Sequence, residues 1–287
     1  MKSYIGAILA TISVAEVMFE PTEVIPSIFT EDEGLEMLLR TYQKYNANID
    51  FEGGFQVNQP VWGLATTPVF DDSMKTSTFD YDNFSWETNI HFMHYAGNWA
   101  VPVRYDLSDE DLEELLDSVN GVYFGGGATP LVDHDTGEHS FFYKTAKRIW
   151  LYMKKQKDEK DIDFPIFGIC QGFELIHFLA NDDHKATLSN VQIYNDSRPM
   201  NYTVKDPKAS SLFAPFPDEL IERMAEEDLL YHAHDWVIKT DTYAERQPMR
   251  DFFNILATDE HNGEEFVVAV EGKHYPVTGV MFHPETQ

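Results

Sequence analysis

The sequence predicts an α/β fold with three layers, αβα, around a mostly parallel central sheet. From Pro60 onward, short apolar runs of strand length alternate with segments whose apolar residues recur at helical spacing. This alternation is typical of parallel strands that helices cover on both faces. The composition, 43% hydrophobic and 14% aromatic over 287 residues, supplies the apolar surface that a large core needs.

The first half of this region shows the clearest alternation of strands and helices. Strands are expected at 61–65, 100–103, 121–124 and 164–169, and helices at 89–96, 109–118, 141–155 and 171–180. Ser108 stands where an N-cap residue would begin the second helix. Because functional residues in open parallel sheets lie at the carboxyl ends of strands, the loops after these strands are the expected place for a site.

The second half is richer in segments with the character of strands. Strands are expected at 191–194, 236–239, 253–257, 266–270 and 277–282, and one short helix at 217–226. No internal repeat and no low-complexity linker divides the region, so residues 60–287 are expected to form one domain.

The N-terminal residues differ from the rest in character. Residues 1–15 contain one lysine, an apolar stretch too short to span a bilayer and a small-x-small ending, which indicate a secretory signal peptide. A first β-strand is the alternative. Residues 16–59 are expected to form an N-terminal extension with a helix from Glu31 to Tyr45 that starts in a capping box, and a loosely ordered arm is the alternative.

The charge pattern excludes two classes of partner. A net charge of −28 argues against a nucleic-acid-binding protein and against docking on a membrane of anionic lipid, because both depend on clustered Lys and Arg. A signal peptide would make the protein secreted, or lysosomal or vacuolar, and three sequons would then be available for glycosylation. Their asparagines are Asn83, Asn195 and Asn201.

The single cysteine, Cys170, lies in Gly168-Ile169-Cys170-Gln171-Gly172, between an apolar run and a helical segment. A strand that delivers a nucleophile to a tight turn needs small residues on both sides, and Gly168 and Gly172 meet that need. The helix that follows would direct free backbone amides at the sulfur and lower the pKa of the thiol. A buried structural thiol is the alternative, and the two glycines favour the nucleophile.

Two other strand ends carry the groups that such a nucleophile requires. Gly125-Gly126-Gly127 follows the strand at 121–124, and His283-Pro284-Glu285 follows the strand at 277–282. A thiolate nucleophile needs a proton acceptor, the acceptor needs an orienting group, and a tetrahedral intermediate needs backbone N–H donors. The other histidines show no spacing that is typical of a metal site.

These segments resemble the class I glutamine amidotransferase-like proteins, a resemblance that implies a flavodoxin-like core. The segments that carry it are Pro60-Val61-Trp62-Gly63-Leu64, Val101-Pro102-Val103-Arg104-Tyr105-Asp106, Asn120-Gly121-Val122-Tyr123-Phe124-Gly125-Gly126-Gly127, Gly168-Ile169-Cys170-Gln171-Gly172-Phe173-Glu174 and Gly279-Val280-Met281-Phe282-His283-Pro284-Glu285. Within this superfamily the chain is most similar to the γ-glutamyl hydrolases. That similarity rests on Cys170-Gln171-Gly172-Phe173-Glu174, Pro199-Met200-Asn201-Tyr202-Thr203 with Phe216-Pro217, His234-Asp235-Trp236 and Tyr275-Pro276-Val277.

The resemblance implies a cysteine-dependent hydrolase that cleaves the γ-glutamyl amide bonds of folyl-poly-γ-glutamates through a thioester, with neither a metal nor an organic cofactor. It implies Cys170 as the nucleophile, His283 as the acid and base, and Glu285 as the group that orients His283. The backbone amides of Gln171 and of the Gly126–Gly127 turn would form the oxyanion hole.

Three further residues are candidates for contacts with the substrate, which would be a small-molecule poly-γ-glutamate. His234 and Glu174 lie in motifs that the resemblance covers, and Arg104 at a strand end is suited to the carboxylate of a glutamyl tail. A structural ion pair with a nearby acid is the alternative for Arg104. The oligomeric state is left open, with a homodimer as one alternative.

The sequence departs from the family pattern in two places. Gly125 stands where the family usually has proline, which is expected to loosen the oxyanion loop. The sequence ends at Gln287, two residues after Glu285, whereas family members continue. We therefore expect either an incomplete chain or a diverged member, with apolar surface exposed and the His283–Glu285 pair on a frayed end.

Two other functions remain open on the sequence. One is a glutaminase of the amidotransferase type, against which the signal peptide and the lack of a synthetase domain argue. The other is a secreted glycoprotein that keeps the scaffold without working chemistry, which Gly125 and the sequence after Glu285 motivate.

Overall fold

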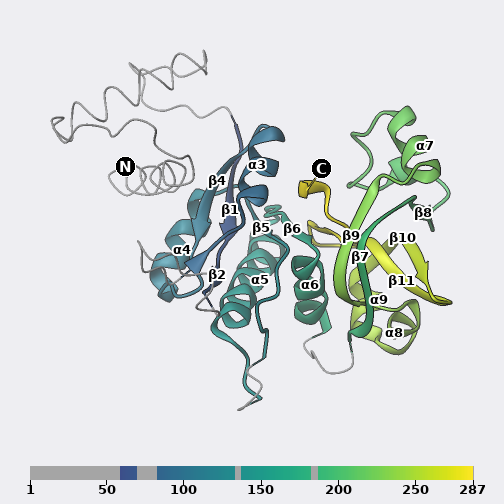
Figure 1. The fold of residues 1–287 in the computed structure, drawn as a ribbon. Helices are drawn as coiled ribbons and strands as arrows, with labels where there is room; N and C mark the ends of the chain where they lie inside the picture. The colour runs from purple at the N-terminus through teal and green to yellow at the C-terminus, as the bar shows by residue number, and fades with distance from the viewer. Residues whose placement is uncertain (1–58, 70–82, 133–136, 182–186, 287) are drawn as a thin grey trace, which may run out of the picture.

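The computed structural model describes residues 59–69, 83–132, 137–181 and 187–286. The predicted signal peptide and the predicted extension up to residue 58 lie outside the described residues. Figure 1 shows the described chain passing from blue strands at one edge of the fold to yellow strands at the other.

An eight-stranded sheet forms the centre of the fold, in the order β4-β1-β5-β6-β12-β11-β10-β8. The bounds are β1 Val61–Ala65, β4 Trp99–Val103, β5 Gly121–Phe124, β6 Ile166–Ile169, β8 Asn201–Tyr202, β10 Phe253–His261, β11 Glu264–Gly272 and β12 Val277–Val280. The five strands from β4 to β12 pair in parallel, and β11, β10 and β8 extend the sheet in antiparallel pairs. By chain position the parallel strands have the flavodoxin-like order, second, first, third, fourth, fifth.

Helices lie on both faces of the parallel strands (Figure 1). α3 (Glu87–Tyr95) covers one face, where the Phe92 ring contacts the rings of Tyr123 from β5 and Phe167 from β6. Successive residues of a strand face opposite sides of its sheet. Gly168, the next residue of β6, accordingly faces the helix on the other side. The predicted α/β fold class, with helices flanking a mostly parallel sheet, is confirmed.

That other face is covered by α6 (Gln171–Asn181) and by α5 (Phe141–Lys160), which packs beside it. α4 (Asp109–Ser118) adjoins α5, and the Tyr152 hydroxyl of α5 donates to Asp117 of α4 at 2.6 Å. The helix α6 is buried along almost its whole length, so it forms the centre of this layer.

Local sequence determines where two of these helices begin. The Ser108 side chain accepts a hydrogen bond from the Asp111 N–H and caps α4, as predicted. The Ser140 side chain does the same for α5 by accepting from the Tyr143 N–H. α5 ends at Lys160, and its C-cap residue, Asp161, adopts a left-handed conformation with φ of 52°.

The remaining strands form two small separate sheets. β7 (Ser189–Arg198) and β9 (Leu230–Val237) form a two-stranded antiparallel ribbon, and β2 (Thr67–Pro68) pairs with β3 (Asn83–Phe84). The short helices are α7 Asp218–Glu226, η2 Pro207–Ala209, α8 Thr240–Glu245, α9 Gln247–Phe252 and η3 Pro284–Thr286.

The predictions were least accurate between β9 and β10. The strand expected at 236–239 is only the end of β9, and the two helices α8 and α9 were not expected. Each of these helices has six residues, and fewer than two turns give too few apolar positions to show a helical period.

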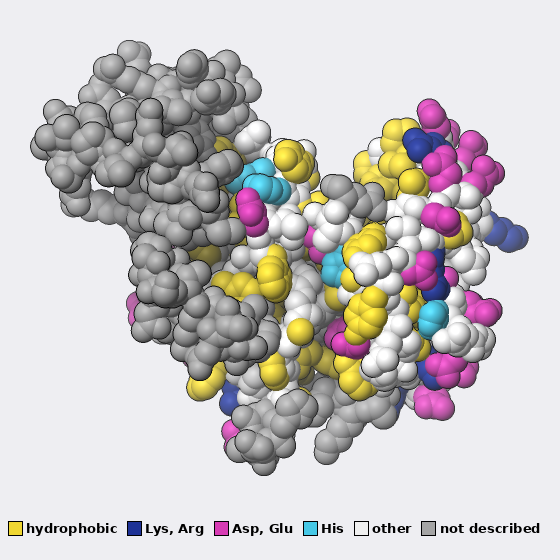
Figure 2. Space-filling view, in the orientation of Figure 1, with side chains coloured by type: hydrophobic (Ala, Val, Ile, Leu, Met, Phe, Trp, Pro, Cys, Tyr) yellow, Lys and Arg dark blue, Asp and Glu magenta, His cyan; other side chains and the backbone are white. Residues whose placement is uncertain are grey.

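The surface agrees with the acidic composition. On the face shown in Figure 2, Asp and Glu side chains gather around α7, whose sequence contains Asp218, Glu219, Glu222 and Glu226. Among the helices that the structure describes, none combines the length and the apolar character that crossing a bilayer demands.

The three sequon asparagines lie on strands. Asn83 is half-buried in β3, whereas Asn195 in β7 and Asn201 in β8 are exposed. The Asn195 Oδ1 accepts from the Tyr231 hydroxyl at 2.8 Å, and the Asn201 Nδ2 donates to the Thr258 Oγ1 at 3.1 Å. Their glycosylation stays a prediction.

The packing of α4 leads to a stability prediction. Leu116 is 2% exposed, so Leu116→Ala is expected to lower the free energy of unfolding by roughly 2–5 kcal/mol. Leu151 on α5 is 55% exposed, and Leu151→Ala is the matched control, with an expected change below about 0.5 kcal/mol. Urea denaturation measures both. Equal unfolding midpoints for the two variants would contradict this packing of α4.

Candidate active site

Cys170 occupies a strained turn between β6 and α6. Its φ is +50°, in the left-handed region that residues with a side chain rarely adopt. The turn is fixed by hydrogen bonds from the Cys170 N–H to the Val280 carbonyl and from the Glu174 N–H to the Cys170 carbonyl, both 3.0 Å. These bonds tie the turn to β12 on one side and to α6 on the other.

The two glycines around Cys170 are required by close backbone contacts. A Cβ on Gly168 would lie 2.5 Å from the Gly172 carbonyl oxygen, and a Cβ on Gly172 would lie 2.0 Å from the Phe124 carbonyl oxygen. Both distances are far shorter than atoms tolerate, so α6 can approach the ends of β5 and β6 only because these positions lack a side chain. The structure therefore has the geometry predicted for a nucleophile turn.

His283 and Glu285 meet Cys170 around Gly126. The His283 Nδ1 is 2.7 Å from the Glu285 Oε1. A Cβ on Gly126 would lie 3.0 Å from the His283 Cε1 and 3.5 Å from both the Cys170 Cβ and the Glu285 Oε1. Three strand ends, those of β5, β6 and β12, thus bring the predicted thiol, imidazole and carboxylate to one place.

The segment that carries His283 is well anchored. The His283 N–H donates to the Tyr231 carbonyl of β9 at 2.9 Å, and the Thr286 Oγ1 donates to the His283 carbonyl at 3.0 Å. The Glu285 side chain is only 3% exposed. The expected frayed end is therefore wrong for residues 283–286, because contacts with β9 and α3 hold η3 in place.

The loop after β5 is held from two sides. The Gln171 side chain donates to the Thr129 carbonyl at 2.6 Å and accepts from the Thr129 N–H at 3.0 Å. On the other side, the Gly125 carbonyl accepts from the Gly172 N–H at 3.1 Å. Thr129 and Gln171 are both buried, so the hydrogen bonds between them do not involve flexible surface groups.

Gly125 has a specific neighbour that explains the missing side chain. A Cβ at this position would lie 2.5 Å from the Nδ2 of Asn89, a buried residue of α3 whose Oδ1 accepts from the Tyr123 hydroxyl at 2.8 Å. Asn89 occupies the space that a larger residue would need. This packing explains the lack of a side chain at position 125, and the looser oxyanion loop stays a prediction.

The pKa values of the central pair are set by burial and by their mutual hydrogen bond. Burial raises the pKa of the Cys170 thiol, and the hydrogen bond with His283 lowers it only in part, so the net direction is opposite to the one expected from α6. Burial also acts to lower the pKa of His283, but hydrogen bonds with Cys170 and Glu285 outweigh it and raise this pKa to about 10. Because the hydrogen bond with Cys170 helps to raise this pKa, the proton of the Cys170–His283 pair is favoured on the His283 ring.

Glu174 lies in the first turn of α6 and is also buried. Burial, followed by the negative charge of Asp235, raises the pKa of its carboxyl to about 8. The carboxyl is therefore protonated at neutral pH and is able to donate a hydrogen bond. This proximity to Asp235 also shows that α6 and β9 approach each other at the site.

The other predicted residues differ in position. His234 lies on β9, buried, with its Nε2 2.9 Å from the His232 Nδ1, and Ala233 next to it places its carbonyl 3.3 Å from the His283 Nε2. Arg104 follows β4, which β1 and β5 separate from β6, and its guanidinium binds Asp106 at 2.9 and 2.7 Å. The structure brings His234 to the site but leaves Arg104 at the sheet edge.

Four residues of the site and its surroundings were not predicted. They are Asn89, Thr129, His232 and Asp259. Asn89 and Thr129 lie in segments without a distinctive motif, so no signal in the sequence marks them. His232 carried a signal that could have been used, since alternation along a strand places residues two apart on one face and so pairs it with His234.

The raised pKa of Glu174 leads to a prediction about stability and pH. Between pH 5 and pH 8 the unfolded chain loses the Glu174 proton while the folded protein keeps it, so the free energy of unfolding falls as the pH rises. Glu174→Gln removes this effect and is expected to stabilise the protein by roughly 1–3 kcal/mol more at pH 8 than at pH 5. Urea unfolding at both pH values measures it.

The exposed Glu159→Gln is the control, and it is expected to change the free energy of unfolding equally at pH 5 and pH 8. A gain for Glu174→Gln that does not depend on pH would show that this carboxyl ionises normally.

Comparison with known proteins places the chain in a family. The family model described as Peptidase C26 matches residues 70–285. A γ-glutamyl hydrolase of Rattus norvegicus is 31% identical over 227 residues, 79% of this chain and 67% of that protein. A γ-glutamyl hydrolase of Homo sapiens is 33% identical over 232 residues, 81% of this chain and 69% of that protein.

Among solved structures, a putative GMP synthase protein from Thermoplasma acidophilum aligns with a TM-score of 0.48 and 15% identity, over 80% of this chain and 86% of that one. The family match covers every strand end that forms the site, from the loop after β5 to Glu285. The chain belongs to the peptidase C26 family.

Proposed function

We propose that the protein is a cysteine-dependent γ-glutamyl hydrolase, with Cys170, His283 and Glu285 as its catalytic residues. The observation that carries the proposal is the meeting of these three side chains around Gly126, where the ends of β5, β6 and β12 converge. The names of the relatives supply the substrate class, a γ-glutamyl amide, and folyl-poly-γ-glutamates are the substrates that we expect.

In the first half of the reaction, the Cys170 sulfur attacks the γ-carbonyl carbon while the proton of the Cys170–His283 pair lies on the His283 ring. The raised pKa of His283 supports this arrangement, because the ring holds the proton of the pair while the sulfur attacks. The carbonyl oxygen becomes an oxyanion, which the backbone N–H groups of Gln171 and of the Gly126–Gly127 turn would stabilise. The two hydrogen bonds between the Gln171 side chain and the Thr129 backbone would hold those donors in place.

The intermediate then collapses to a thioester on Cys170, as the amide nitrogen departs with the proton that His283 returns to it. A water molecule attacks the thioester and gives its proton to His283, and the thiol is restored when that proton passes back to sulfur. Glu285 takes no proton in this cycle. Its hydrogen bond to the His283 Nδ1 fixes the ring and stabilises the imidazolium.

The location outside the cell or in a lysosomal or vacuolar compartment belongs to the same proposal. Its support is the signal-like character of residues 1–15. A homodimer stays an open alternative.

The central test is product analysis with folyl-poly-γ-glutamate. The wild-type chain is expected to shorten the polyglutamate tail, and Cys170→Ala is expected to abolish turnover, because no other cysteine exists to form the thioester. Mass spectrometry of the products measures both. His274→Asn, at an exposed position away from the site, is the control. Cleavage by Cys170→Ala at the wild-type rate would overturn the proposal.

Glu285→Gln is expected to lower kcat/KM by roughly 10²-fold, a smaller loss than that of Cys170→Ala, because Glu285 orients the imidazole and does not react. The variant should also bring the pKa of His283 down, since it removes the carboxylate that raises it. Steady-state kinetics and an NMR titration of the His283 ring measure the two effects. An unchanged pKa would mean that Glu285 does not stabilise the imidazolium.

A further inference from the structure

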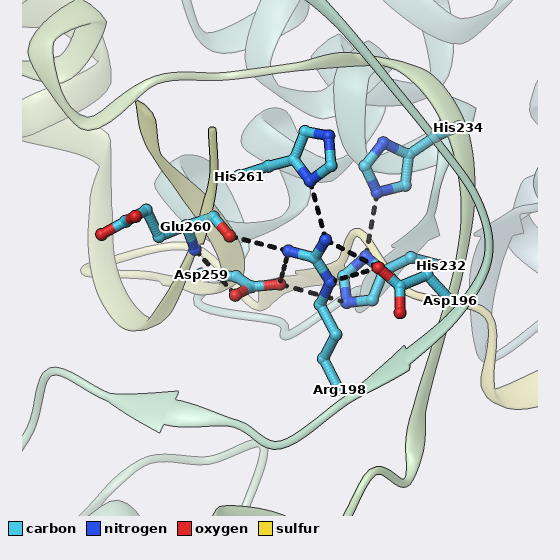
Figure 3. A network of polar contacts seen from close by, with 7 residues as sticks. All are labelled: Asp196, Arg198, His232, His234, Asp259, Glu260 and His261. Carbon is cyan, nitrogen blue, oxygen red and sulfur yellow. Dashed lines mark hydrogen bonds and ion pairs between the residues drawn. The ribbon is translucent and has the colours of Figure 1, made fainter. Parts of the chain in front are cut away.

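A polar network that runs from the surface to two buried histidines lies behind the proposed site, on the side of β9 and β10 (Figure 3). Arg198 forms its centre and donates to Asp196 at 2.7 and 2.8 Å, to Asp259 at 3.1 Å and to the Glu260 carbonyl at 2.7 Å. The Arg198 Nη2 also lies 2.8 Å from the His261 Nδ1. These contacts hold the Asp259 carboxylate in place beside Arg198.

Two histidine rings connect Asp259 to the site: His232 lies next to Asp259, and His234 lies next to His232. The Asp259 Oδ2 is 3.8 Å from the His232 Nε2, and the His232 Nδ1 is 2.9 Å from the His234 Nε2. Both rings are buried, with side chains 1% and 4% exposed. The other nitrogen of His234, Nδ1, is buried and has no hydrogen-bond partner among the described residues.

His234 lies next to the proposed acid and base. The carbonyl of Ala233, its neighbour on β9, is 3.3 Å from the His283 Nε2. Burial first, and then the charge of His283, lowers the pKa of His234 to about 4. Burial, the neighbouring His234 and the charge of Arg198 lower the pKa of His232 to about 3. Both imidazoles are therefore neutral, and each has one N–H and one bare nitrogen.

The charge of Asp259 decides which nitrogen of each ring holds the proton. A separation of 3.8 Å is too long for an ordinary hydrogen bond, but a carboxylate still favours an N–H over a lone pair facing it. With the proton of His232 on Nε2, its Nδ1 is an acceptor, so the His234 Nε2 must donate. The Nδ1 of His234 is then left as a bare acceptor.

The backbone of Trp236 acts in the opposite sense, because it favours a proton on the His234 ring. No hydrogen bond joins it to the Nδ1, however, whereas the Nε2 has a partner at 2.9 Å. A neutral backbone group that makes no well-formed hydrogen bond to the Nδ1 acts more weakly than the charge at the other end of the chain of rings.

We propose that Asp259 and His232 are positioning residues that hold His234 with its proton on Nε2, so that Nδ1 accepts a hydrogen bond from the N–H of the scissile γ-amide. The inference rests on the proposed function. A buried acceptor without a partner costs free energy, and a substrate N–H supplies that partner. When His234 accepts this hydrogen bond, the lone pair of the amide nitrogen points away from His234 and toward the proton that His283 must deliver. It also favours amides over esters, which have no N–H.

The kinetic test compares a γ-glutamyl anilide with the matching γ-phenyl ester. His232→Leu is expected to lower the ratio of amide to ester kcat/KM by roughly five- to tenfold, the effect of one neutral hydrogen bond. His232→Asn, whose Oδ1 can accept in place of the ring Nδ1, is expected to restore most of the ratio. The exposed His274→Asn is the control and should leave the ratio unchanged. An equal loss on both substrates for His232→Leu would overturn the inference.

The second test reads the tautomer directly and does not depend on turnover. In the full chain labelled with ¹⁵N-histidine, the His234 signals are identified by their loss in His234→Gln. We expect a protonated Nε2 and a bare Nδ1 in the wild type at neutral pH, and a shift toward the other tautomer in His232→Leu. A protonated Nδ1 in the wild type would overturn the inference. Failure of the wild type to cleave either substrate would instead refute the proposed function, and the NMR result would still decide the tautomer.

Discussion

The arrangement of the site depends on the close approach of α6 to the ends of β5 and β6. The Gly172 contact with the Phe124 carbonyl leaves no room for a side chain, and the Gly172 N–H then reaches the Gly125 carbonyl. This contact fixes the turn that presents Cys170 and the loop that contains Gly126. Because β12 pairs with β6 along its whole length, His283 emerges beside the same turn.

Electrostatics divides the site into a part that reacts and a part that supports it. Around Cys170, hydrogen bonds with Glu285 and Cys170 raise the pKa of His283, so that the ring holds the proton of the pair while the sulfur reacts. Behind β9, the charge of Arg198 helps to keep His232 and His234 neutral. A protonated histidine, His283, thus lies close to two neutral ones, His232 and His234. Glu285 stabilises the positive charge of His283, whereas Asp259 determines which nitrogen of His232 holds the proton.

Much of the fold could be predicted from the sequence because its signals are local. The strands at 61–65 and 121–124 and the helix at 109–118 agree with the structure, since each rests on a continuous apolar run or on a helical period with a cap. The region after β9 was predicted poorly. Its helices α8 and α9 are too short to show a period, and tertiary packing rather than local pattern holds them.

For the site, the sequence alone determined the turn and the chemistry at the strand ends: glycines on both sides of Cys170, the loop at 125–127, and His283 with Glu285. These follow from local backbone demands that residue types reveal. Only the tertiary structure decided that Asn89 fills the space beside Gly125, that Gln171 holds Thr129, and that Asp259 faces His232. Those pairs are 36, 42 and 27 positions apart in the chain, and a contact across that separation depends on how the elements pack, which no local pattern contains.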